Sequence, residues 1–200
     1  MAVLRLTPRT SGTCRRARGV IQACLLGAVV LFPWGPSLGA QAARASEYQV
    51  KAVFLFNFAQ FVDWPARAFH DSTAPFVIGV LGNDPFGAYL DETVRGETVH
   101  GRPLEVHRYQ GVGEIKTCHI LFISPSEEDR LGEILDTLRD RAILTVGDLP
   151  AFALRGGMIR FVADKSRIRL RINIEAAKAA NLTISSKLLR AAEIVTSDRP

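Results

Sequence analysis

The chain contains none of the short motifs that bring catalytic or metal-binding side chains together. It has no G-x-S-x-G turn, no C-x-x-C pair, no phosphate-binding loop and no H-E-x-x-H helix. Its four histidines lack the i, i+3 or i+4 spacing of paired ligands, since they stand at His70, His100, His107 and His119. We therefore expect a binding protein rather than an enzyme, with no catalytic residues, no cofactor and no metal.

Acidic residues are absent from the first 42 positions. Five arginines between positions 5 and 18 are followed by an apolar run over Gly19–Phe32. Pro33, Gly35 and Pro36 end that run, and Ala40-Gln41-Ala42 is a small-x-small cleavage pattern. This order predicts a signal peptide at residues 1–42, cleaved on export to the periplasm. The alternative is a membrane anchor, although the run is shorter than the ~20 residues that a spanning helix needs.

Net charge is also absent once that segment is removed. The whole chain has 25 basic and 20 acidic residues. Five of the basic residues and none of the acidic ones lie in residues 1–42, so 20 of each remain. A neutral domain lacks the positive surface of a nucleic-acid-binding protein, so we expect no nucleic acid partner. Residues 43–200 suffice for one domain with a hydrophobic core.

Cysteine is scarce in the same region. Cys14 and Cys24 belong to the predicted signal peptide, which leaves Cys118 alone in the exported chain. An internal disulfide is then impossible. Cys118 precedes an apolar run and is interpreted as a small buried side chain at the start of a strand. The alternative is a reactive or intermolecular thiol.

Three short apolar runs predict parallel strands, because each ends in turn residues and helical patterns lie between them. They lie at residues 76–81, 118–124 and 141–148. Two alternating runs, Met158–Val162 and Ile168–Asn173, predict an antiparallel hairpin. We therefore predict an α/β protein with a single open three-layer domain. It would have a mostly parallel central sheet, helices on both faces and a C-terminal antiparallel hairpin.

Two helices are predicted after the hairpin. Asn173 is placed to cap a helix through Ala180, and Asn181 suits its left-handed end. Ser185-Ser186 begins a last helix whose apolar positions continue to Val195.

Polar residues follow each of the three predicted parallel strands and should lie along one edge of the sheet. They are Asn83 and Asp84, then Ser124 and Ser126, then Asp148. Open parallel sheets bind their ligands at this carboxyl edge, so we predict a site for an unidentified small molecule there. The alternative is that these are ordinary turn and capping residues. Asp84, for example, is placed to cap a helix that begins at Pro85.

A strongly apolar helix is predicted at the start of the exported chain. Ser46 and Gln49 form a capping box, and Trp64-Pro65 ends the helix. Gln49, Val53, Phe56 and Gln60 fall close to one face. Phe56 is therefore a candidate for a partner interface, and packing against the sheet is the alternative.

Arginines alternate along the second hairpin strand. Arg167, Arg169 and Arg171 share one face. Such a row is usually a solvated surface. The alternative is contact with an acidic partner, and Arg169 and Arg171 are our candidates for it.

Several segments resemble the YfiR family, also called the DUF4154 domain. The first and last are the most specific, and all occur in the family's order: KAVFLFNFAQFVDWP (51–65), VLGNDPFG (80–87), HGRPLEV (100–106), CHILFIS (118–124), ILTVGD (143–148), GGMIRFV (156–162) and LRINIEAAKAANLTISSKLLRAAEIV (170–195). Together they extend over residues 46–196, nearly the whole predicted mature chain.

The resemblance implies a periplasmic regulator. Such relatives bind the periplasmic part of an inner-membrane diguanylate cyclase and hold it inactive, which lowers cyclic di-GMP and disfavours biofilm formation. They are described as dimers that are redox-sensitive through paired cysteines. This chain departs from them because only Cys118 remains after export. The competing hypothesis is a single-lobe periplasmic protein that binds a small molecule for a transporter or sensor.

Overall fold

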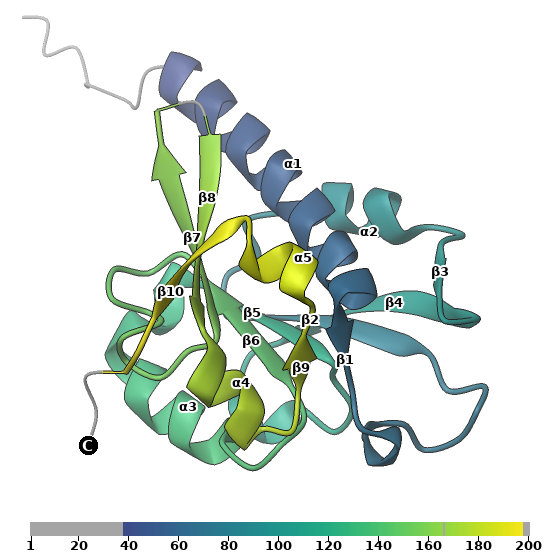
Figure 1. Cartoon of the computed structure of the whole chain (residues 1–200). Coiled ribbons are helices and arrows are strands. Elements are labelled where there is room, and N and C mark those ends of the chain that lie inside the picture. The colour runs from purple at the N-terminus through teal and green to yellow at the C-terminus, as the bar shows by residue number, and fades with distance from the viewer. Residues whose placement is uncertain (1–37, 166, 198–200) are drawn as a thin grey trace, which may run out of the picture. The chain divides into compact units, whose positions relative to one another are not determined.

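The computed structural model describes residues 38–165 and 167–197. Most of the predicted signal peptide, residues 1–37, lies outside the described residues. The described chain forms a large mixed sheet flanked by helices (Figure 1). The helices are α1 (Leu38–Phe61), α2 (Ala88–Val94), α3 (Leu131–Leu138), α4 (Ile174–Ala179) and α5 (Ser186–Leu189), with 3-10 turns η1 (Ala66–Ala68), η2 (Val112–Glu114) and η3 (Pro125–Arg130). None of the described helices has the length and apolar character needed to cross a membrane.

The main sheet has eight strands in the order β10-β8-β7-β6-β5-β2-β4-β3. Their bounds are β2 (Phe76–Leu81), β3 (Thr98–Val99), β4 (Arg102–Tyr109), β5 (Ile120–Ile123), β6 (Leu144–Gly147), β7 (Ile159–Asp164), β8 (Arg167–Asn173) and β10 (Ala192–Val195). Strands β4, β2, β5, β6 and β7 are mutually parallel. The predicted mostly parallel open sheet is therefore confirmed.

The order of these parallel strands creates a topological switch point. The chain passes from β2 to β4 on one side and then returns to place β5 on the other side of β2. The loops after β2 and β5 therefore diverge at the carboxyl edge. This is the place where open α/β sheets bind ligands.

Helices cover both faces of the sheet, as predicted. Along β5, Ile120 and Phe122 belong to one hydrophobic cluster, and Leu121 and Ile123 to another. This separation follows from the alternation of side chains along a strand. The first cluster contains core residues of α1, α2, α4 and α5, and the second contains those of α3.

The predicted hairpin is confirmed and is part of the main sheet. β7 and β8 pair in antiparallel register, with Phe161 opposite Leu170. β7 also pairs with β6 in parallel. The hairpin extends from the sheet so that its tip lies beside the first half of α1 (Figure 1).

Helix boundaries differ from the predictions. Helix α1 ends at Phe61 rather than at Trp64, because Val62–Asp63 pairs with Thr183–Ile184 as a short strand. Helix α1 begins at Leu38 rather than Ser46, because the preceding segment is rich in alanine, the best helix former. The last helix, α5, ends at Leu189 instead of continuing to Val195. The residues beyond it form β10, which pairs in parallel with β8. The β-branched pair Ile194-Val195 suits a strand at this position.

The predictions for the helix before α5 are confirmed. The side chain of Asn173 accepts a hydrogen bond from Ala176 N and caps α4. Asn181 adopts a positive φ of 58°. A second, two-stranded sheet then pairs β1 (Val62–Asp63), at the end of α1, with β9 (Thr183–Ile184).

Candidate functional site

The switch point joins the turns after β2 and β5 by hydrogen bonds. Asn83 N donates to Ser126 Oγ at 3.0 Å. Ser124 caps η3, with its side chain accepting a hydrogen bond from Ser126 N. Three of the five predicted edge residues, Asn83, Ser124 and Ser126, are therefore brought together.

These side chains fill the edge instead of leaving it open. Gly82 has a φ of +84°, and a Cβ built on it would lie 2.3 Å from Ser126 Oγ and 2.6 Å from Glu127 Oε1. The turn therefore needs glycine for its backbone and for the close approach of η3. Ser126 and Glu127 therefore cover Gly82, while Asn83 beside it stays exposed.

Asp84 ties the turn after β2 to its neighbours. Its Oδ1 accepts hydrogen bonds from Phe86 N at 2.7 Å and Gly87 N at 3.3 Å. Its Oδ2 accepts one from Arg108 Nε at 2.8 Å. The predicted cap on a helix starting at Pro85 is wrong, because α2 begins at Ala88 and Asp84 closes a tight turn ahead of it.

Arg108 completes this network with a two-point contact to a second carboxylate. Its terminal nitrogens lie 2.9 and 2.6 Å from the carboxylate oxygens of Asp91. The hydrogen bond from Arg108 lowers the pKa of Asp91 below its usual value. The charge of Asp84 is thus already satisfied within the protein, which favours a structural role over ligand binding.

Asp148, the last predicted edge residue, lies in a buried charged cluster. Its Oδ2 is 2.5 Å from the Nζ of Lys51 on α1 and accepts a hydrogen bond from Tyr48 Oη at 2.9 Å. Lys51 also lies 2.5 Å from Glu47 Oε1, and its side chain is only 2% exposed. Burial and the charge of Asp148 raise the pKa of Tyr48 well above its usual value.

Two buried polar atoms near the end of β6 have no hydrogen-bond partner within the described residues. They are Asp148 Oδ1 and Arg160 Nε. They lie on different faces of the sheet, because Phe161 packs toward Lys51 and α1 while Arg160, one position earlier on the strand, points to the other side. Burial and the charge of Arg171 lower the pKa of Arg160, and Asp148 opposes that shift. The spare acceptor of Asp148 could bind a small polar ligand on the α1 side of this edge.

The partner-interface candidates differ in exposure. Phe56 is half-buried and packs against the main hydrophobic cluster. Among the described side chains of α1, the large exposed apolar ones are instead Val50 and Val53, at 45% and 44%. Arg169 and Arg171 lie on the sheet face opposite that cluster. Arg169 pairs with Asp164 at 2.8 Å, and Arg171 pairs with Glu193 at 2.9 Å.

The β7–β8 hairpin concentrates positive charge in a domain that is otherwise balanced. Residues 158–173 contain five basic residues and one acidic residue, so the segment carries a net charge of +4: Arg160, Lys165, Arg167, Arg169 and Arg171 against Asp164. The sequence analysis identified three of these basic residues, Arg167, Arg169 and Arg171, as a row on one face of the second hairpin strand. It gave no sign that the Nε of Arg160 would be buried without a hydrogen-bond partner among the described residues.

Cys118 and His119 are core residues. Cys118 is buried, its thiol donates to Ile120 O, and burial raises its pKa to about 12. His119 Nδ1 accepts from Val77 N at 3.0 Å, and Nε2 lies 3.1 Å from Ala68 O. Both positions therefore favour the structural interpretation, and a reactive thiol does not fit the environment of Cys118.

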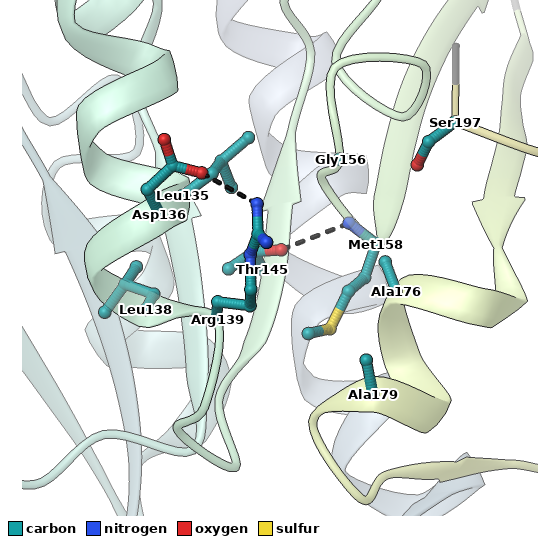
Figure 2. Close-up of a pocket in the computed structure, with 10 residues that line it drawn as sticks. All are labelled: Leu135, Asp136, Leu138, Arg139, Thr145, Gly156, Met158, Ala176, Ala179 and Ser197. Atoms are coloured by element: carbon teal, nitrogen blue, oxygen red, sulfur yellow. Dashed lines mark hydrogen bonds and ion pairs between the residues drawn. The ribbon is translucent and has the colours of Figure 1, made fainter. Parts of the chain in front are cut away.

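A separate pocket of about 240 Å³ lies between α3 and α4 (Figure 2). Arg139 pairs with Asp136 on α3 at 3.0 Å, and Thr145 Oγ1 accepts a hydrogen bond from Met158 N beneath them. None of the five predicted edge residues lines this pocket. It is also smaller than the ~300–1,000 Å³ of typical ligand pockets. We therefore place no ligand in it.

Two larger hollows flank the hairpin. One, of about 340 Å³, separates its tip from the first half of α1. The other, of about 460 Å³, lies between the hairpin and β10 and is lined by Arg169, Arg171 and Arg190. The described residues contain no group of His, Cys, Asp and Glu side chains suited to a metal ion. Of the pockets described above, the two largest therefore lie beside the hairpin.

Comparison with known proteins identifies a family. Residues 48–193 match the family described as YfiR/HmsC-like. This range contains every described strand of the main sheet except the end of β10. No curated protein matches the chain significantly.

Proposed function

Since this chain belongs to the YfiR/HmsC-like family, we propose that it inhibits an inner-membrane diguanylate cyclase by binding the cyclase's periplasmic region. Proteins of this family are regulatory rather than catalytic, and they are in general periplasmic. In this proposal the bound cyclase is held inactive and cyclic di-GMP stays low. The family match over residues 48–193 is the observation that carries the proposal.

The surface of the domain supports binding to another protein. The hairpin carries a net charge of +4 and is flanked by two hollows. Arg169 and Arg171 hold only surface ion pairs, which contribute little and are exchanged at low cost. Phe56 would take part only through the edge of its half-buried ring, beside the more exposed Val53.

We further propose export through the signal peptide at residues 1–42. Cleavage after Ala42 would remove residues 38–42 from the start of α1. Tyr48 and Lys51 would remain in the mature chain, with their contacts to Asp148. A homodimer is part of the same proposal. With Cys118 buried, such a dimer would be held without a disulfide.

The test combines a gene deletion with capture of the partner. Deleting the gene in its host should raise cyclic di-GMP, and the wild-type gene should restore the low level. A tagged chain crosslinked in host membranes should retain an inner-membrane diguanylate cyclase. The variant Arg169→Glu/Arg171→Glu should retain less of it, while Lys178→Glu, on exposed α4, should behave as the wild type. Unchanged cyclic di-GMP in the deletion strain would refute the proposal.

A second candidate function is small-molecule binding by a single lobe serving a transporter or sensor. The unpartnered Asp148 Oδ1 favours it. A ligand there would raise the melting temperature of the purified protein, and Asp148→Asn would remove that increase. Retention of a transporter instead of a cyclase in the membrane capture would favour this function.

A further inference from the structure

A groove of about 340 Å³ separates the first half of α1 from the tip of the β7–β8 hairpin. Its helix side is formed in part by Arg44, Glu47 and Val50, and its hairpin side by Lys165, Arg167 and Ile168. These two sides are more than 110 residues apart in sequence, and Figure 1 shows the start of α1 beside the tip of the hairpin.

The groove is positively charged because its described lining has three cations and one acid. Arg44, Lys165 and Arg167 are exposed, and they form no ion pair among the residues that the structure describes. Glu47 is the acid of the groove, and its Oε1 is held by the buried Lys51. Three free positive charges therefore face a space whose one carboxylate is already engaged.

The groove also contains apolar surface. Val50 is 45% exposed, and Ile168 is half-buried beside it. The matching ligand thus combines negative charge with aliphatic side chains. A bilayer surface fits less well, since helices that lie on membranes insert large apolar or aromatic side chains, and Val50 is the single large exposed apolar residue among the described lining of this groove.

We propose that this groove binds an acidic, partly aliphatic segment of the protein partner. The inference deepens the proposed function and rests on it for the partner being a protein. Complementary charge across such an interface accelerates encounter and excludes partners of the wrong sign. Aliphatic contacts at Val50 and Ile168 would then slow dissociation.

The first experiment tests the groove without the natural partner. A fluorescent peptide, (Glu-Leu-Glu-Ala)₃, is titrated with the protein purified from the periplasm, and binding is followed by anisotropy. We expect Arg44→Glu/Arg167→Glu to weaken binding at least tenfold. The control Arg95→Glu/Lys116→Glu makes the same change in net charge at exposed positions outside the groove and should weaken it less than twofold.

Three results of that titration would overturn the inference. Equal weakening by both charge reversals would mean that net charge alone is sensed. Equal binding of (Lys-Leu-Lys-Ala)₃ would remove the requirement for acid. Tighter binding to vesicles of phosphatidylglycerol than to the peptide, lost in the groove variant, would assign the groove to a membrane surface. Circular dichroism checks that both variants remain folded.

The second experiment separates failure of the groove from failure of the proposed function. In the deletion strain, cyclic di-GMP is measured with the wild-type gene, the groove variant or the control variant. If the deletion raises cyclic di-GMP and the groove variant fails to lower it, the inference is supported. If the groove variant lowers it fully, the inference is wrong and the regulatory function stands. If the deletion has no effect, the cyclase proposal fails and the titration alone decides.

Discussion

Lys51 and Asp148 form a buried ion pair that fastens the first helix to the end of a central strand. Their Nζ and Oδ2 atoms are 2.5 Å apart, and the side chains are 2% and 10% exposed. The two residues are 97 positions apart in sequence. Lys51 also lies over the ring of Tyr48, 4.2 Å from its centroid, so an aromatic face and two carboxylates surround one ammonium group.

Removing one member of this pair should be strongly destabilising. Lys51→Met leaves Asp148 as a buried charge with only Tyr48 to compensate it, which costs about 3–5 kcal/mol of unfolding free energy. Urea denaturation followed by circular dichroism measures the loss. Lys178→Met, which breaks the exposed pair with Glu175, should stay within about 0.5 kcal/mol of the wild type. Similar losses in the two variants would show that the buried ion pair of Lys51 contributes no more to stability than an exposed one.

The coupling between the two residues can be measured separately. Asp148→Asn removes the buried negative charge, so Lys51→Met should cost less in that background than in the wild type. The difference between the two costs is the interaction free energy of the pair. Fully additive losses would contradict the contact.

Gly82→Ala should destabilise the switch point more than the same change nearby. Its Cβ would collide with Ser126 Oγ, and the residue would also keep a φ of +84°. Gly96→Ala is the matched control, because φ is +76° there and no atom lies within 4 Å of the new Cβ. We expect about 1 kcal/mol for the control, which carries the backbone term alone, and a larger loss for Gly82→Ala. Equal losses would mean that η3 moves away from the new methyl group without a loss of stability.

Stability should fall as the pH is lowered through the range in which His119 titrates. Burial lowers the pKa of His119 to about 4, helped by Arg102 and opposed by the hydrogen bond to Ala68 O. The unfolded chain binds a proton near pH 6.5, so this contribution is complete above pH 6.5 and is lost progressively down to pH 4. It amounts to about 3 kcal/mol at most.

Urea titrations at pH 7 and pH 5 test this sign. His119→Gln should be less stable at pH 7 but should show a smaller difference between the two pH values. A wild-type protein equally stable at both would rule out the proposed linkage to His119.

Cys118 should be inert in the native protein. Burial raises its pKa to about 12, so the thiolate that reacts with alkylating agents is scarce at neutral pH. Iodoacetamide should label the protein only after denaturation, as judged by mass spectrometry. A reducing agent should leave the melting temperature unchanged. Rapid labelling of the folded chain would revive the reactive-thiol interpretation.

The sequence predicted elements whose signal is local. The apolar runs at 76–81 and 118–124 contain β2 and β5, and Asn173 has the capping role that its position predicted. The helix predicted through Val195 was wrong because short apolar runs do not distinguish a helix from a strand. Pairing with β8, a distant partner, decides that segment.

The candidate site depended on contacts that no local pattern encodes. Three of the five predicted edge residues lie together, whereas Asp84 is engaged by Arg108 and Asp148 by Lys51. A lysine inside the apolar run VKAVFLF was the available signal for a buried cation. Its partner could not be inferred, because the contact depends on how α1 crosses the sheet.

Helix α1 has 24 residues, so it forms a rod about 36 Å long. Arg44 lies near one end, Lys51 is fixed near the middle, and at the other end Phe61 O accepts a hydrogen bond from Ser185 N. A tilt of the rod about its fixed middle moves the two ends in opposite directions. If a protein bound beside Arg44 tilts the rod, hydrogen exchange at the Ser185 amide should change, and the binding would then be detected at the opposite end of α1.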